Sequence, residues 1–280
     1  MKSILAVVGD GAARSLLETA LLVAKRFNGR IVGLNTLTTE YAVVFGGEMG
    51  FSISSEVDRT LEREGQERRE AARALFSSFM REHGLPVGPA APGELSAEWR
   101  EETGRQNAVA GSFGRIFDLV LVERPEKLAS LAEATLEDAL FESGRPVMMA
   151  PPTPPATIGE RVSIAWNGST ETARTVAFAM PFLERAKEVE VVSVEEGMTP
   201  GPAGEELARS LALHGMPVTA RHVQARGRTP GQAFLDEAKA FNADLLIKGA
   251  YTQSRLRQLI FGGATRHIIM EATIPVLLAH

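Results

Sequence analysis

The feature that most constrains this fold is a pair of short apolar segments that occurs twice in the chain. In the second half, Asp244-Leu-Leu-Ile precedes a glycine-containing stretch and then Ile274-Pro-Val-Leu, and in the first half Asp118-Leu-Val-Leu precedes Gly144-Arg-Pro-Val. A short apolar run bounded by turn residues is typical of a buried strand. A chain that repeats the same two strands is predicted to contain the same domain twice.

The rest of the chain alternates helical and strand periodicity in the same order on both sides of Pro151–Pro155, where four of five residues are proline. Such a segment cannot continue a strand or a helix, so it is predicted to be a spacer. The expected helices are 12–27, 56–83, 105–115, 132–142, 170–185, 204–214, 229–241 and 264–272, and the expected strands are Ile4–Val8, Ile31–Leu34, 96–100, 118–122, 146–150, Val162–Trp166, Val189–Val194, 217–223, 244–248 and 275–279.

Alternating strands and helices of this kind predict parallel sheets with right-handed crossovers. The predicted fold class is therefore α/β, with two doubly wound parallel-sheet, Rossmann-like domains in tandem, at residues 1–151 and 160–280. The first domain carries an apolar, glycine-rich insertion around 36–60. Asp10 and Asn167 follow the first strand of each half and are expected to be counterparts.

Composition excludes several classes of protein. The formal net charge is −5 and neither half is strongly basic, which argues against a general nucleic-acid binder. No apolar run approaches the roughly 18 residues of a membrane helix. Cysteine is absent, and the five histidines are scattered without metal-ligand spacing. We expect a cytoplasmic protein with no metal site.

The stretch between the last two strands predicts an anion site in the second half. Gly249, Gly262 and Gly263 allow a close backbone approach, and the helix after Gly263 offers unpaired N–H groups. From Lys248 to Met270 there is no Asp or Glu, whereas the corresponding stretch from Glu123 to Ala150 has six acidic and three basic residues. The acidic stretch of the first half should repel a triphosphate, so the first half is predicted not to bind ATP.

Two other interpretations of the second-half stretch stay open. The glycines could form only a tight strand-to-helix turn. The basic side chains, which are Arg255, Arg257 and Arg266, could instead pair with carboxylates of the first half or of a second subunit.

The residues quoted above resemble the universal stress protein family in its tandem form, over nearly the whole chain. The signature of that family is Gly, two residues, Gly, nine residues, Gly and then Ser or Thr, before the last helix. Here the four positions are Gly249, Thr252, Gly262 and Gly263, so the second and fourth depart from the pattern while the nine-residue spacing is kept.

The resemblance implies an adenine nucleotide α-hydrolase-like fold and an ATP site, with or without Mg, in the second half only. Asn167 would hydrogen-bond ribose or adenine where the family has an aspartate. Thr252 would be strained if its position needs a positive φ, and Thr265 would replace the hydroxyl that Gly263 lacks. The candidate binding residues are Ala165, Asn167, Val194, Gly249, Thr252, Gly262, Gly263, Ala264, Thr265 and Arg266.

The resemblance also implies that Val147–Ala150 and Val276–Ala279 are strands that associate across a pseudo-twofold axis, which makes the chain an internal pseudo-dimer. A homodimer and unidentified protein partners are further expectations. We expect a stress-response sensor or interaction protein in which any ATP hydrolysis is slow and incidental.

Two rival functions come from other classes. One is an interaction scaffold in which both nucleotide sites have decayed. The other is an enzyme of the related α-hydrolase-like group, but there is no phosphate-loop, dinucleotide or nucleophile-elbow motif and no paired carboxylates beside a histidine. The sequence therefore predicts no catalytic residues.

Overall fold

The structure is a computed structural model of the 280-residue chain that describes residues 1–9, 13–37, 55–89, 91, 93–250 and 263–280. Most of the insertion expected at 36–60 lies outside the described residues, so its role stays a prediction. The elements of the first half are β1 (Ser3–Val7), α1 (Ala13–Phe27), β2 (Arg30–Leu37), α3 (Ser55–Glu82), β3 (Ser96–Thr103), α4 (Gln106–Gly114), β4 (Leu119–Glu123), α5 (Leu131–Glu142) and β5 (Val147–Ala150).

The second half repeats this order, with a short 3-10 turn added. Its elements are β6 (Arg161–Trp166), α6 (Thr170–Leu183), β7 (Glu188–Val194), η1 (Glu195–Gly197), α7 (Gly204–Ala212), β8 (Val218–Val223), α8 (Pro230–Ala240), β9 (Leu245–Gly249), α10 (Ala264–Glu271) and β10 (Val276–Ala279). Every helix and strand expected from periodicity is present, and the boundaries move by a few residues at most. The predicted α/β fold class is confirmed.

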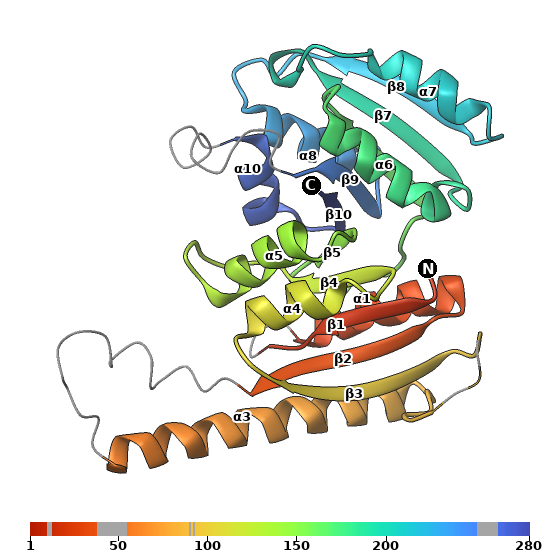
Figure 1. Ribbon diagram of the computed structural model, residues 1–280. Coiled ribbons are helices and arrows are strands. Elements are labelled where there is room, and N and C mark those ends of the chain that lie inside the picture. Colours follow the sequence, from red (N-terminus) through yellow and green to blue (C-terminus); the bar gives the residue numbers. More distant parts are fainter. Residues whose placement is uncertain (10–12, 38–54, 90, 92, 251–262) are drawn as a thin grey trace.

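The described strands form one sheet in the order β3-β2-β1-β4-β5-β10-β9-β6-β7-β8 (Figure 1). All neighbours are parallel except β5 and β10, which run antiparallel. Met148 of β5 lies opposite Leu277 of β10, and these two residues are counterparts in the repeat. The pseudo-twofold axis therefore passes through this pair, as expected for an internal pseudo-dimer.

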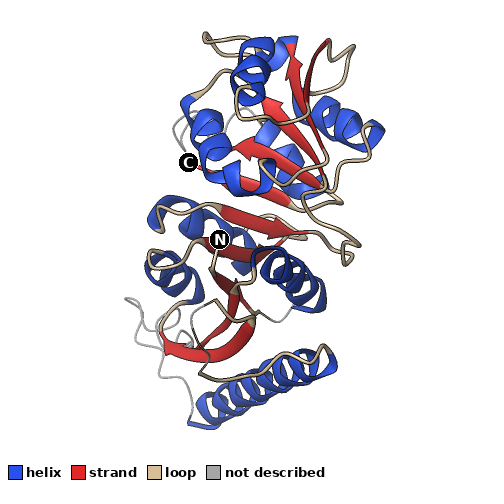
Figure 2. Cartoon of the chain, turned by 90° about the vertical axis from the view of Figure 1, so that its right-hand side faces the viewer, coloured by secondary structure: helices blue, strands red, loops and turns tan. Residues whose placement is uncertain are grey.

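Helices cover both faces of the sheet (Figure 2). One face packs against α1, α3, α6 and α7 in a core cluster that includes Phe27, Phe76 and Phe182. The other packs against α4, α5, α8 and α10 and includes Leu136 and Phe234. Both clusters contain residues of both halves, because the sheet is continuous across β5 and β10.

An aspartate at the start of β4 and another at the start of β9 fix the register of the repeat. Asp118 accepts the backbone N–H groups of Lys2 (2.5 Å) and Ser3 (3.1 Å). Asp244 accepts those of Glu160 (3.1 Å) and Arg161 (3.0 Å) in the same way. Partial burial raises the pKa of Asp118, but these backbone hydrogen bonds outweigh it and leave the pKa below its ordinary value.

This register corrects one sequence-based expectation. Because Ser3 is the counterpart of Arg161, the counterpart of Asn167 is Gly9 and not Asp10. The sequence places both residues at the end of a strand, and only the backbone hydrogen bonds decide which one matches. By the same register, Glu123 is the counterpart of Gly249, since they end β4 and β9 opposite Ala150 and Ala279.

Candidate functional site

The strand order reverses between β1 and β4 in the first half and between β6 and β9 in the second. Ligands of open α/β sheets bind in the crevice at the carboxyl ends of such a strand pair, because the crossovers leave it uncovered. Each half therefore has one position where the topology favours a site, and the residues at these two positions differ.

At the second-half position, the side chain of Asn167 organises the corner between β6 and α6. Its Oδ1 accepts Thr172 Oγ1 at 2.6 Å and the N–H of Ser169 at 3.2 Å, while its carbonyl accepts Thr199. Ser169 caps α6 by accepting the N–H of Thr172. The buried Asn167 Oδ1 thus stabilises the turn itself.

Gly249 ends β9 directly against the first turn of α6. A Cβ added to Gly249 would lie 2.6 Å from Thr172 Oγ1 and 2.7 Å from the carbonyl carbon of Glu171, and it would also clash with the backbone nitrogen of Thr172. Real Cβ atoms do not come this close, so packing alone requires a glycine here. Gly249 would be needed even if no ligand bound.

The glycines at 249 and 263 should therefore respond differently to substitution. We expect Gly249→Ala to lower the free energy of unfolding by about 1–3 kcal/mol, because overpacking forces α6 away from β9. Gly263→Ser should leave it unchanged or raise it by a few tenths of a kcal/mol, because a Cβ at Gly263 meets nothing within 4 Å and serine is a good N-cap. Urea unfolding without nucleotide checks both. Equal destabilisation by the two substitutions would contradict this account.

Gly263, Ala264, Thr265 and Arg266 together form the start of α10. Gly263 is the N-cap and makes no side-chain cap, and the first turn holds no acidic residue. Thr265 is buried at 7% exposure and Arg266 is exposed. This helix end rests on α8, since a Cβ on Gly231 would meet the carbonyl oxygen of Ala264 at 2.6 Å.

The corresponding helix α5 begins in the opposite way. Ser130 accepts the N–H of Glu133 at 3.2 Å, and Glu133 accepts the N–H of Ala129, the residue before the N-cap, at 2.6 Å, in an arrangement similar to a capping box. The helix has 12 residues against eight in α10, so it begins one turn earlier. A carboxylate of α5 itself therefore lies at the start of that helix, whereas no acidic residue stands in the first turn of α10.

The remaining candidate residues divide into two groups. Ala165 and Val194 are fully buried and belong to the core on the α8 and α10 face, so they fill space beneath the corner.

Thr252 and Gly262 lie outside the described residues, as do Arg255 and Arg257. Arg266 makes no ion pair with any described residue. The structure thus brings together Asn167, Gly249 and α6, and separately the first turn of α10.

Lys248 was not singled out as a buried group by sequence reasoning. It lies at the end of β9 with 2% exposure, and its Nζ donates to the carbonyl oxygen of Gly249 at 3.0 Å. Burial lowers the pKa of its ammonium group to about 8, partly opposed by Glu171. A lysine in an otherwise apolar strand is the signal that could have identified it.

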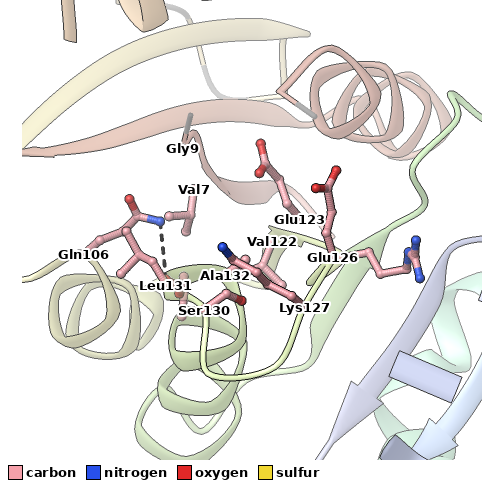
Figure 3. A pocket seen from close by; sticks show the side chains of 12 residues that line it. Val7, Gly9, Gln106, Val122, Glu123, Glu126, Lys127, Ser130, Leu131 and Ala132 are labelled. Atoms are coloured by element: carbon pink, nitrogen blue, oxygen red, sulfur yellow. Dashed lines mark hydrogen bonds between the residues drawn. The ribbon is translucent and has the colours of Figure 1, made fainter. Parts of the chain in front are cut away.

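A second feature that sequence reasoning missed is a cavity at the first-half position. It measures about 440 Å³ and lies between the ends of β1 and β4 and the first turns of α4 and α5 (Figure 3). Val7, Gly9, Gln106, Glu123 and Leu131 are among its lining residues. From the sequence, this position is predicted only as a lost nucleotide site.

The comparisons with known proteins agree with this architecture. The sequence profile of the Universal stress protein family matches residues 160–280. The second half of this chain therefore belongs to the universal stress protein family. Within the part of the chain that the structure describes, no helix is both long and apolar enough to span a bilayer, and no cluster of potential metal ligands occurs.

The full-length structural matches share the tandem α/β fold of this chain. A stretch of 49 residues is 33% identical to the stress response protein NhaX of Bacillus subtilis, and covers 18% of this chain and 30% of that relative. The crystal structure of a universal stress protein from Archaeoglobus fulgidus matches 99% of this chain and 95% of its own, with a TM-score of 0.69 and 15% identity. A protein of unknown function from Pseudomonas aeruginosa matches 100% and 92%, with a TM-score of 0.59 and 16% identity.

Proposed function

We propose that this tandem universal stress protein is a stress-response sensor or interaction protein with at most one adenine nucleotide site, in its second half. The nucleotide phosphates would lie at the start of α10, with ATP, alone or as its magnesium complex, as the ligand. The ribose and adenine would lie toward Asn167, above the buried Ala165 and Val194. Binding would change a surface available to partners and would not drive turnover.

The contrast between α5 and α10 is the observation that carries this proposal. A helix N-terminus attracts anions because its first N–H groups are unpaired and the helix dipole is positive there. In α5 that end is capped by Ser130 and Glu133, whereas the N-cap of α10, Gly263, supplies no side-chain cap and Arg266 places a cation in the first turn. A cation in this position opposes the dipole, and a bound phosphate would reverse that penalty.

A second candidate function is an interaction scaffold that binds no nucleotide, and two observations favour it. Gly249 is required by its contact with α6, and Asn167 Oδ1 is used by Ser169 and Thr172. Both residues therefore have structural reasons to be present. The surfaces that bind partners would then be the only functional part of the molecule.

Calorimetric titration of the purified protein with ATP and magnesium tests the first proposal. We expect saturable binding at one site per chain. Arg266→Ala should weaken it by roughly tenfold or more, because a charge-assisted hydrogen bond to phosphate contributes about 1.5–3 kcal/mol.

Arg209→Ala is the matched control, because Arg209 is an exposed arginine of the same half, in α7, that pairs only with Glu206 among the described residues. This variant should bind ATP as the natural chain does. Absence of binding heat, together with an unchanged unfolding temperature at high ATP concentration, would favour the scaffold.

A further inference from the structure

We propose that the first-half cavity is a binding site for a small organic cation, one that carries an ammonium, amidinium or guanidinium group on an apolar body. The cavity lies in the other half of the molecule, so its ligand does not depend on the proposed nucleotide site. This cavity occupies the first-half counterpart of the proposed nucleotide site. The residues expected to bind phosphate are missing there, and we assign a cation to it instead.

The cavity exists because Gly9 has no side chain. Its counterpart Asn167 fills the corresponding corner and binds Ser169 and Thr172. At Gly9 an added Cβ would lie 3.5 Å from Gln106 Nε2 and 3.9 Å from both Gln106 Oε1 and Glu123 Oε2, which is ordinary van der Waals contact. A larger side chain would therefore grow into the space between Gln106 and Glu123, which flank Gly9 in Figure 3.

Two side chains that carry oxygen acceptors, Gln106 and Glu123, border this space. Thr135 Oγ1 donates its single proton to the carbonyl of Leu131 at 2.7 Å, so it can only accept from Gln106 Nε2 at 3.3 Å. This hydrogen bond uses one of the two N–H groups of Nε2 and fixes the orientation of the Gln106 amide, whose Oε1 keeps its capacity to accept. Together with the Glu123 carboxylate, Oε1 forms a pair suited to a group with several N–H donors.

The charges around the cavity disfavour a phosphate. Glu123 replaces Gly249 at the end of the strand, and Glu133 already caps α5. Glu126 adds a second carboxylate at the mouth, while the exposed Lys127 and the half-buried Arg124 carry positive charge. Arg124 also lines a smaller hollow beside Pro151 and Pro152. Among the charged groups that line the cavity, the Glu123 carboxylate is the one placed against Gly9.

The remaining walls suit an apolar body. Val7 and Val122 form the floor at the ends of β1 and β4, and Leu131 and Ala132 line the side that α5 provides. Leu131 is 51% exposed, although it is a large apolar residue. A volume of about 440 Å³ is within the range of small-molecule sites. The ligand would place its cationic end at Glu123 and Gln106, with its body over these residues.

Benzamidine, benzamide and benzoate test this proposal, because they have the same ring and differ in charge. We expect ligand-detected NMR titration to show saturable binding of benzamidine and binding of benzamide weaker by about tenfold or more, since the amide lacks the charge. Benzoate should not bind. Preference for benzoate, equal binding of all three or no saturable binding of benzamidine would overturn the proposal.

Two variants place the binding in the cavity. Glu123→Gln keeps the shape of the side chain and should weaken benzamidine by about tenfold, whereas Glu205→Gln, at an exposed site in α7, should not. Gly9→Leu should abolish binding by filling the space, with circular dichroism to check folding. Benzamidine binding that is unchanged in Glu123→Gln would overturn the proposal even if Gly9→Leu failed to fold.

Discussion

Phe182→Ala is expected to lower the free energy of unfolding by roughly 3–5 kcal/mol, the typical cost of removing a buried phenylalanine. Phe182 has 0% exposure and contacts Phe27 edge-to-face, with ring centroids 4.8 Å apart. The two rings belong to α6 and α1, which are helices of different halves. The substitution therefore removes contacts that join the halves as well as contacts within one of them.

Both halves should lose stability together, because the core clusters and the sheet are continuous across the pseudo-twofold axis. The chain has two tryptophans, with Trp99 in the first half and Trp166 in the second. Variants that keep one of them, Trp166→Phe or Trp99→Phe, report on each half separately. In guanidinium unfolding followed by fluorescence, Phe182→Ala should shift both midpoints equally.

Phe234→Ala provides the matched control. Phe234 is equally buried but belongs to the other core face, under α8. If Phe182→Ala lowered the Trp166 midpoint and left the Trp99 midpoint in place, the halves would unfold independently and the interface would not unite them.

Much of the fold could be predicted because each helix carries an apolar stripe and each buried strand is a short apolar run. The repeat of Asp118 and Asp244 is visible in the sequence, and both aspartates fix the start of the neighbouring strand in the sheet, β1 or β6. These are local patterns, so their prediction needs no knowledge of distant contacts. The association of β5 with β10 followed from the family resemblance, and the structure shows that the two strands run antiparallel.

The candidate site was less predictable because its residues act through tertiary contacts. A glycine such as Gly249 gives the same pattern whether a ligand or a helix approaches it, and only the position of Thr172 distinguishes the two cases. The cavity beside Gly9 was missed for a similar reason. Backbone hydrogen bonds are needed to pair Gly9 with Asn167. The sequence pattern pairs Asn167 with the next residue, Asp10, and this displacement by one residue hides the fact that a glycine replaces Asn167 in the first half.

Lys248→Met is expected to raise the free energy of unfolding by about 3 kcal/mol at pH 7. Burial lowers the pKa of Lys248 from 10.5 to about 8. A tenfold change in proton affinity between the folded and unfolded chains corresponds to about 1.4 kcal/mol of stability. Methionine has a similar length and no charge, and Val122 holds the corresponding position in the first half. An apolar residue is therefore compatible with this place in the sheet.

The gain should depend on pH with a defined sign. Below pH 8 both the folded and unfolded chains keep the proton, so the folded state carries the full cost of a buried charge. Between pH 8 and 10.5 the unfolded chain binds more protons than the folded one, so the stability conferred on the natural chain by this residue rises with pH. The difference between the natural chain and Lys248→Met should consequently shrink over that interval.

Urea unfolding at pH 7 and near pH 10 measures this difference directly. Lys239→Met, which removes an exposed lysine of α8, should change the stability by less than about 0.5 kcal/mol at either pH. A gain for Lys248→Met that stayed constant with pH would mean that its cause is packing and not charge. Destabilisation at pH 7 would mean that the hydrogen bond from Nζ to the carbonyl of Gly249 outweighs the cost of burial, and the lysine would then be a structural part of the end of β9.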